Sequence, residues 1–341
     1  MSIKRITTIR VLMLALLAAV ILPLAGQPLW AQQAKKRIIN RYSMRLIPQK
    51  DGSYKLDSKT LAVLDGAEPE GLYEPYQSVP VVPTSKVSDV PVEKVVYKQY
   101  PDREEMMLVC KAVNATVPTP VVCFIHGGGW SAGSETGYRK HIAYLAKYEG
   151  LAAVSIGYTL AGAEGADIAV TMQDLHDAVQ YLREHAAEYN LDMTRLAFVG
   201  SSAGGHLSAM MAITEPCAKV HSGWSGVYDI AAQRENWTKG KNERLYRYFL
   251  MNDESRFKNY SPIHIIPHDR QIAVQLFHGT GDASVPYDQT IRYAEALREA
   301  GFRTVECNIY PYYSHGLTGS SDKGRECFAK FIKFVKAHIY E

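Results

Sequence analysis

Residues 200–204, with the sequence GSSAG, constrain the fold more than any other part of the chain. They have the pattern G-x-S-x-G, they follow a mostly apolar run at 195–199 that is typical of a buried strand, and they lead into a helix-like segment at 206–211. A serine at such a strand-to-helix turn takes a strained backbone conformation, in which side chains two positions away on either side would collide. The pattern therefore predicts a nucleophile elbow with Ser202 as the nucleophile, rather than an ordinary glycine-rich turn.

Strand-like and helix-like segments alternate from about residue 90 to the C-terminus. Apolar runs typical of strands lie at 94–99, 106–113, 121–125, 152–156, 196–199, 220–223, 272–277 and 304–309. Apolar residues spaced by three and four at 172–186 and 328–339 predict amphipathic helices. Because no helix separates the first two runs, the pattern predicts an α/β fold whose central sheet is mostly parallel with an antiparallel first pair and helices on both faces. Such sheets place their sites at the carboxyl ends of the strands.

Three consecutive glycines follow the strand-like run at 121–125, within the sequence HGGGW at 126–130. Bare backbone N–H groups at such glycines can turn toward one point, as an oxyanion hole requires. The pattern predicts that Gly127 or Gly128 donates to a developing negative charge together with the N–H of Ala203, the residue after the nucleophile. A phosphate loop is disfavoured, because neither of the glycine-rich phosphate-binding patterns is present.

An aspartate and a histidine follow the last two predicted strands. Asp282 lies in the loop after 272–277, and His315 lies in the loop after 304–309. Each residue alone is a weak signal, because loop aspartates usually form turns and loop histidines are usually only exposed. The chain order Ser202, Asp282, His315 is, however, the serine, acid, histidine order of one type of catalytic triad. We expect Asp282 to orient His315, and His315 to act as the base.

These motifs together resemble the α/β-hydrolase esterases of the hormone-sensitive-lipase-like group and of the feruloyl- and acetyl-xylan-esterase-like group. The resemblance rests on HGGGW at 126–130, on GSSAGGHL at 200–207 and on the loops of the acid and the histidine, and it extends from about residue 90 to the C-terminus. One departure is Thr159, at a position where an arginine is common in this family. The resemblance implies the α/β-hydrolase fold and a two-step acyl transfer through Ser202 that needs no cofactor.

The first 31 residues have the pattern of a secretory signal peptide. Three basic residues precede an uncharged apolar run at 11–22, and Pro23 and small residues follow it. The alternative, a membrane anchor, is disfavoured because this run is shorter than the ~20 residues of a spanning helix. We therefore expect cleavage after Ala31, with sites near Gly26 and Ala34 as alternatives. We also expect a secreted or periplasmic location and no stable membrane insertion of the mature chain.

Two further segments complete the predicted organisation. Residues 32–88 are polar and lack a sustained apolar period, so we expect an N-terminal extension before a catalytic domain at 89–341. An aromatic-rich insertion at about 229–270 predicts a small cap, whose aromatic side chains either line an acyl pocket or, as we favour for most of them, form the core of the cap. They are Trp237, Tyr246, Tyr248, Phe249, Phe257 and Tyr260. Trp130, beside the oxyanion glycines, is the aromatic residue that we expect to bind substrate.

The charge balance argues against a polyanionic partner. Without the first 31 residues, which hold three basic and no acidic side chains, the chain has 35 basic and 35 acidic side chains. A neutral chain lacks the clustered basic footprint that nucleic-acid binding needs. The five cysteines form no C-x-x-C pair and no H-E-x-x-H motif is present, so we expect no metal site. The sequence carries no signal for the oligomeric state.

Polar residues between the cap aromatics argue against an interfacial lipase, because such an enzyme usually presents a large apolar surface. Aromatic rings beside polar side chains suit sugar rings and aromatic acids. We therefore expect a small-molecule or glycan ester as substrate, with short-chain or hydroxycinnamoyl acyl groups. The alternatives are a lipase or a secreted serine peptidase of the same fold, and a catalytically inactive binding module.

Overall fold

The structure is a computed structural model. It describes residues 46–48, 54–56, 86–237, 243–250, 253, 255–310, 313–315, 317 and 322–341. The predicted signal peptide and most of the predicted N-terminal extension lie outside these residues. The chain divides into two compact units, of which the larger comprises Val79–His278, Gln289–Asn308 and Gly316–Glu341. The smaller comprises Met1–Ser78, Gly279–Asp288 and Ile309–His315.

An eight-stranded sheet is the centre of the fold, and all eight predicted strands are present in it. Along the chain they are β3 (Glu93–Gln99), β4 (Glu104–Cys110), β5 (Thr119–Ile125), β6 (Ala152–Ile156), β7 (Leu191–Ser201), β8 (Ala218–Trp224), β9 (Ala273–Gly279) and β10 (Val305–Tyr310). Their order across the sheet is β10-β9-β8-β7-β5-β6-β4-β3. A separate antiparallel pair, β1 (Leu46–Pro48) and β2 (Tyr54–Leu56), belongs to the smaller unit.

The strand directions confirm the predicted sheet and add one detail. β3 and β4 pair antiparallel, while the pairs β5–β6, β5–β7, β7–β8 and β8–β9 are parallel. β4 also pairs antiparallel with β6, so β4 runs against both of its neighbours. The edge strand β3 has an irregular register against β4, with a shift between Val96 and Lys98.

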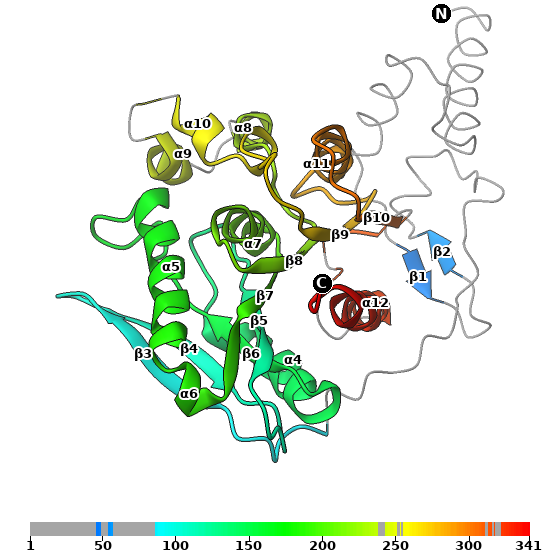
Figure 1. The fold of residues 1–341 in the computed structure, drawn as a ribbon. Coiled ribbons are helices and arrows are strands. Elements are labelled where there is room, and N and C mark those ends of the chain that lie inside the picture. Colours follow the sequence, from blue (N-terminus) through cyan, green and yellow to red (C-terminus); the bar gives the residue numbers. More distant parts are fainter. Residues whose placement is uncertain are drawn as a thin grey trace, which may run out of the picture. The chain divides into compact units, whose positions relative to one another are not determined.

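Helices connect the strands. They are η1 (Glu135–Tyr138), α4 (Arg139–Tyr144), η2 (Leu145–Glu149), α5 (Ile168–Glu184), α6 (Ala186–Tyr189), α7 (Ala203–Thr214), α8 (Ile230–Trp237), α9 (Glu243–Leu250), α10 (Arg256–Asn259), η3 (Pro262–His264), α11 (Asp288–Glu299) and α12 (Asp322–His338). In the larger unit, α5 and α7 cover one face of the sheet, and α4 and α12 cover the other (Figure 1). No helix among the described residues is long and apolar enough to cross a membrane.

Both predicted amphipathic helices form, for the reason that the sequence indicates. In α5, Met172, Leu175, Val179 and Leu182 are buried, and the Asp167 carboxylate caps the helix by accepting from the Val170 N–H at 2.9 Å. This places one apolar stripe of α5 against the sheet and gives the first turn a side-chain acceptor. In α12, the apolar positions of the same kind are buried as well, namely Phe328, Phe331, Ile332, Val335 and Ile339.

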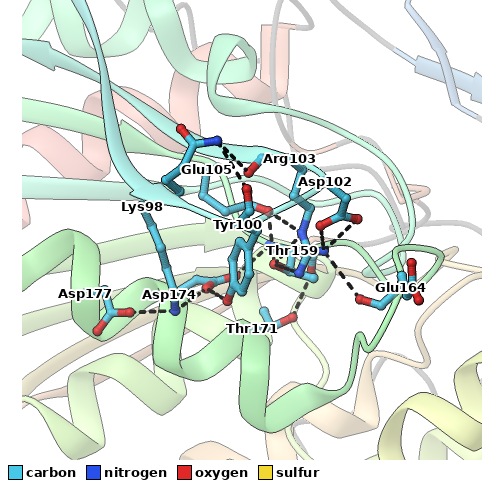
Figure 2. A network of polar contacts seen from close by, with 12 residues as sticks. Lys98, Tyr100, Asp102, Arg103, Glu105, Thr159, Glu164, Thr171, Asp174 and Asp177 are labelled. Carbon is cyan, nitrogen blue, oxygen red and sulfur yellow. Dashed lines mark hydrogen bonds and ion pairs between the residues drawn. The ribbon is translucent and has the colours of Figure 1, made fainter.

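A buried carboxylate joins β3, α5 and the loop after β6 (Figure 2). Asp174 of α5 is fully buried, and its carboxylate accepts from the Tyr100 hydroxyl at 2.6 Å and from the Thr159 N–H at 2.9 Å. The Lys98 ammonium lies 2.9 Å from the same carboxylate. Because a buried charge is costly unless it is paired and hydrogen-bonded, these three partners are what allow Asp174 to be buried.

Thr159 takes part in this network, at a position where the esterases that the sequence resembles commonly have an arginine. Its hydroxyl donates to Glu105 at 3.0 Å and accepts from the Arg103 guanidinium at 3.3 Å (Figure 2). Arg103 lies between β3 and β4 and also pairs with Glu105 at 3.3 Å. The loop after β6 therefore does have a guanidinium beside it, but Arg103, between β3 and β4, supplies it instead of the residue at position 159.

We expect the Asp174→Asn variant to be destabilised by about 2–4 kcal/mol. The buried amide would carry no negative charge to pair with Lys98, and its NH2 group, a donor, cannot accept a hydrogen bond from the Tyr100 hydroxyl or the Lys98 ammonium. Asp177→Asn is the matched control, since its carboxylate contacts the same Lys98 at 2.6 Å but its side chain is 34% exposed. That control should lose less than about 1 kcal/mol. Urea denaturation measures both variants. Equal losses in the free energy of unfolding would mean that the burial of Asp174 does not increase the cost of removing its charge.

Candidate active site

Ser202 occupies the turn between β7 and α7 of the larger unit. Its backbone angles are φ 59° and ψ −122°, a region that non-glycine residues rarely adopt. The Ser202 N–H donates to the Trp224 carbonyl at 2.9 Å, and the His206 N–H donates to the Ser202 carbonyl at 3.1 Å. The strain of such a conformation persists because the surrounding structure fixes it, as is common at functional sites.

Glycines around Ser202 let three backbone segments come into contact. A Cβ atom on Gly200 would lie 2.2 Å from the Gly204 carbonyl oxygen, and a Cβ on Gly204 would lie 2.1 Å from the Ile125 carbonyl oxygen. On Gly205 it would lie 2.8 Å from the Cα of Gly226. These neighbours are backbone atoms, which cannot turn aside as a side chain could. The elbow therefore requires glycine at these positions because of close backbone approach.

The loop that follows β5 lies directly against the elbow. A Cβ atom on Gly127 would be 2.6 Å from the Ser201 carbonyl oxygen and 3.3 Å from the Ser202 Cβ. Gly128 has φ +117°, and the N–H groups of Ser131 and Ala132 donate to its carbonyl at 3.2 and 3.1 Å. The structure thus brings Gly127 next to Ser202. The predicted role of Gly127 and Gly128 as oxyanion donors stays a prediction.

Ala203 is the first residue of α7. The first N–H groups of a helix have no acceptor within the helix, and they carry the positive end of the helix dipole. An N–H group at this position can therefore serve an anion that forms at Ser202, as the sequence predicts for Ala203.

The side chain of His126 binds the backbone of the glycine loop. The carbonyl of Gly127 can only accept, so His126 Nδ1 carries a proton and donates to it at 2.8 Å. The imidazole stacks on the Tyr158 ring with the centroids 4.2 Å apart, and the Tyr158 hydroxyl donates to the His126 carbonyl at 2.9 Å. Burial lowers the pKa of His126. The ring is therefore neutral near pH 7, and its contacts are structural.

Trp130 packs inside the larger unit. Its side chain is 3% exposed, and its indole N–H donates to Nδ1 of His206 at 3.2 Å. Its ring also meets Phe249 of α9 edge-on, with the centroids 4.9 Å apart. All of these contacts are with the protein itself, and contact of Trp130 with substrate stays a prediction.

The aromatic residues of the predicted cap are mostly internal. Tyr248, Phe249 and Phe257 are buried, whereas Tyr246 is 41% exposed. Tyr248 donates its hydroxyl to Thr171 of α5 at 2.5 Å. These positions agree with a packing role for most of the aromatics, which is the interpretation that the sequence favours. The side chain of Trp237 lies outside the described residues.

Asp282 and His315 form a hydrogen-bonded pair in the smaller unit. His315 Nδ1 lies 2.6 Å from Asp282 Oδ2, and the other carboxylate oxygen accepts from the N–H groups of Ser284 and Val285 at 2.8 and 2.9 Å. Asp282 is 1% exposed, while the side chain of His315 is 28% exposed. Because an ionised carboxylate can only accept, Nδ1 carries the proton and Nε2 of the neutral ring is left as the basic nitrogen.

The two loops of this pair are joined through their backbones. The N–H groups of Thr280 and Gly281 donate to the carbonyls of Tyr310 and Tyr313 at 2.9 and 3.0 Å. A Cβ atom on Gly279 would lie 2.0 Å from the Tyr313 carbonyl oxygen. The acid and the histidine are therefore fixed relative to each other. Ser202 belongs to the larger unit and this pair to the smaller, so their joint action is a proposal.

A cavity of about 410 Å³ lies beside the glycine loop of the larger unit. Its wall includes His126 and Gly157, the residues directly after β5 and β6, so it lies at the carboxyl ends of these strands. Two ion pairs line it, Lys94–Glu135 at 2.9 Å and Arg103–Glu105 at 3.3 Å. The wall thus carries cations and carboxylates that largely neutralise each other.

Two features that border the glycine loop were not predicted from the sequence. One is this cavity, whose charged residues come from three separate segments and form no local motif. The other is His206, which is fully buried and contacts Trp130. A signal for His206 was available, since it lies four residues after Ser202 on the helix of the elbow, one turn away.

Within the part of the chain that the structure describes, no three or more His, Cys, Asp and Glu side chains are grouped so that they could hold a metal ion. The expectation that the chemistry needs no metal or cofactor stays a prediction.

Comparison with known proteins identifies relatives of the chain. A model of the BD-FAE family matches residues 108–297, more than half of the chain. A probable isoprenylcysteine alpha-carbonyl methylesterase of Arabidopsis thaliana is 24% identical over 210 residues, which are 55% of this chain and 44% of that protein. The probable carboxylic ester hydrolase LipM of Mycobacterium tuberculosis is 25% identical over 67% of this chain and 56% of its own length. The chain thus spans about half the length of these relatives.

Solved structures show the same fold. A thermophilic esterase from Thermogutta terrifontis, with propionate bound, matches 74% of this chain and 95% of its own chain, with a TM-score of 0.60 and 24% identity. This similarity, together with the strand order and directions, confirms the predicted α/β-hydrolase fold.

We expect Gly200→Ala to destabilise the protein by more than about 3 kcal/mol, because the new methyl group would overlap backbone atoms at 2.2 and 2.7 Å. Gly129→Ala is the matched control. Gly129 has φ +58°, but no atom lies within 4 Å of the added carbon, so only the conformational cost of about 1 kcal/mol applies. Thermal denaturation compares the two variants. If Gly200→Ala were as stable as Gly129→Ala, the close backbone contact at the elbow would be wrong.

Proposed function

The chain belongs to the BD-FAE family, and we propose that it is a carboxylic-ester hydrolase that acts through Ser202, His315 and Asp282. The observation that carries this proposal is the backbone of Ser202, which combines φ 59° with a position at a strand-to-helix turn against Gly127. This conformation presents a serine side chain at the carboxyl edge of the sheet, where α/β proteins place their sites.

The hydrogen bond between Asp282 and His315 supports the same proposal. It fixes the tautomer with the proton on Nδ1, as a general base that works through Nε2 requires. The names of the relatives add support, because an esterase, a carboxylic ester hydrolase and a methylesterase are among them.

The proposed reaction has two steps. Ser202 Oγ attacks the ester carbonyl while His315 Nε2 takes its proton, and Asp282 stabilises the imidazolium that forms. The N–H groups of Gly127 or Gly128 and of Ala203 stabilise the tetrahedral oxyanion, at about 3 kcal/mol for each donor. The carbon–oxygen bond to the alcohol then breaks, and the alcohol leaves with the proton from His315. Water, activated by the same histidine, releases the acid from the acyl-enzyme.

We further propose that the alcohol part of the substrate is a neutral, hydroxylated group such as a sugar of a glycan. The cavity beside the glycine loop supports this, since 410 Å³ is within the usual range for small-ligand sites. Its two cations are already paired with carboxylates, and Glu104 adds a third carboxylate, so an anionic ligand is disfavoured. Hydroxyl groups, which both donate and accept, can bind to such a wall. Export of the chain, which the sequence predicts, would give access to an extracellular glycan.

We expect Ser202→Ala, Asp282→Asn and His315→Ala to fold normally and to lose about 10⁴-fold or more in kcat, and their losses not to add, because the three groups act as one unit. Hydrolysis of p-nitrophenyl acetate measures the rates, and mass spectrometry after fluorophosphonate labelling identifies the modified serine. Ser201→Ala is the control and should lose little. The proposal is wrong if Ser201 is labelled instead, or if Ser202→Ala remains active.

The substrate proposal has a separate test at Ser131, which lines the cavity and holds Gly128 through its backbone N–H rather than its side chain. We expect Ser131→Leu to lower kcat/KM about tenfold for acetylated or feruloylated oligosaccharides and to leave p-nitrophenyl acetate turnover nearly unchanged, because remote binding contributes only with the sugar ester. The exposed Ser88→Leu is the control. Equal loss on both substrates would refute the sugar site. A preference for acyl chains of about ten carbons or more, with activation at an oil–water interface, would indicate a lipase.

A further inference from the structure

His206 joins three parts of the larger unit through one imidazole ring. The residue lies on α7, one turn after Ser202, and is fully buried. Its Nδ1 lies 3.2 Å from the indole nitrogen of Trp130, in the loop after β5. Its Nε2 lies 2.7 Å from the carbonyl oxygen of Tyr260, at the end of α10. The helix of the elbow, the glycine loop and the segment between β8 and β9 therefore meet at this side chain.

The partners of His206 define its protonation state. An indole N–H can only donate, so Nδ1 of His206 must accept from Trp130. A backbone carbonyl can only accept, so Nε2 must carry the proton toward Tyr260. The neutral tautomer with the proton on Nε2 is therefore the form that satisfies both hydrogen bonds. The pKa of His206 is lowered to about 4, because the effect of burial outweighs that of the hydrogen bond to the Tyr260 carbonyl, so this tautomer is present at neutral pH.

Trp130 needs these contacts because its backbone is strained. It has φ 56°, a conformation that costs a non-glycine residue about 1–2 kcal/mol, and it directly follows the three glycines of the loop. The Trp130 carbonyl accepts from the Ala161 N–H at 2.8 Å, and the indole is held by His206 and by the edge of the Phe249 ring. A change in the orientation of the indole would turn the backbone that precedes it, which includes Gly127 and Gly128.

The segment between β8 and β9 contacts the same side chains. The Phe249 ring meets both Trp130 and His206 edge-on, with centroid distances of 4.9 and 5.8 Å. Next to Tyr260, the buried Ser261 hydroxyl accepts from the Ile230 N–H at 2.9 Å, which fixes the carbonyl that His206 binds. The glycine loop and the helices α8 to α10 are thus connected through one hydrogen-bonded histidine.

We infer that His206 is a positioning residue for the oxyanion hole: through Trp130 it sets the direction of the glycine N–H groups beside Ser202, and through Tyr260 it couples this loop to the segment of α8 to α10. The inference rests on the proposed function. It assigns to His206 no contact with the substrate and no transfer of a proton. A displacement of about 1 Å in such a loop is enough to lower turnover by about 100-fold.

Two substitutions separate the two hydrogen bonds. In His206→Asn, the amide oxygen can take the place of Nδ1 and accept from Trp130, but the side chain is too short to reach the Tyr260 carbonyl. In His206→Gln, the amide nitrogen can take the place of Nε2 and donate to Tyr260, but the acceptor for the Trp130 indole is lost. We expect His206→Gln to lower kcat by about 10- to 100-fold with KM within about twofold. The kcat of His206→Asn should be at least about tenfold higher than that of His206→Gln.

Trp130→Phe provides a second variant, since it removes the indole N–H and keeps an aromatic ring. It should lower kcat to the same extent as His206→Gln, and the double variant should lose no more than either single variant. Ser208→Ala is the structural control, because Ser208 is fully buried on the same helix and its hydroxyl donates within α7. It should reduce thermal stability without lowering kcat.

The indole N–H resonance of Trp130, identified by its absence in Trp130→Phe, tests the geometry independently of turnover. In the inactive Ser202→Ala protein we expect it to shift in His206→Gln and to keep its position in His206→Asn. If the resonance shifts as expected but the protein with Ser202 intact has no esterase activity, the proposed function is refuted while the hydrogen bond between Trp130 and His206 stands. Equal losses of kcat in the Asn and Gln variants, or a loss of stability without a loss of kcat in both, would overturn the positioning role.

Discussion

The site depends on the contact of bare backbone segments at the carboxyl edge of the sheet. The end of β5, the end of β7 and the start of α7 approach so closely that the positions of Gly200 and Gly204 leave no room for a Cβ atom. Gly127 then lies against Ser202. Because these contacts involve main-chain atoms, they fix the distance between the serine and the glycine loop without depending on the rotamers of side chains.

Polar groups stabilise this arrangement on the side of β4 and β6. Asp174 binds the backbone of Thr159, and the neighbouring Tyr158 stacks on His126, which in turn holds Gly127. A carboxylate on α5 is therefore connected to the glycine loop through a short series of direct contacts. Since a buried polar network is stable only when all of its members are satisfied, a change at one of them affects the others.

Much of this structure could be predicted because its causes are local in the sequence. The strands are short apolar runs, α5 and α12 carry an apolar stripe, and the elbow needs small residues at fixed positions around Ser202. The pairing of Asp282 with His315 was expected from their places after the last two strands, and His315 Nδ1 lies 2.6 Å from Asp282 Oδ2. The orientation of β4 against β6, the use of Arg103 beside Thr159 and the contact of Trp130 with His206 could not be predicted. Each of these features depends on residues that are far apart in the chain. Several ways of packing such residues are compatible with the sequence pattern, and only their relative free energies decide which one forms.

The irregular register of β3 has a consequence for the behaviour of the protein in concentrated solution. β3 lies at one end of the described sheet, where unpaired N–H and C=O groups could bind an extended segment of another molecule. The shift between Val96 and Lys98 interrupts the regular spacing of these groups, and Lys94 and Lys98 place charges along the strand. An incoming strand would meet a ladder that it cannot match and ammonium groups that it would have to desolvate. The same two lysines that pair with Glu135 and Asp174 thus also protect the edge of the sheet from aggregation.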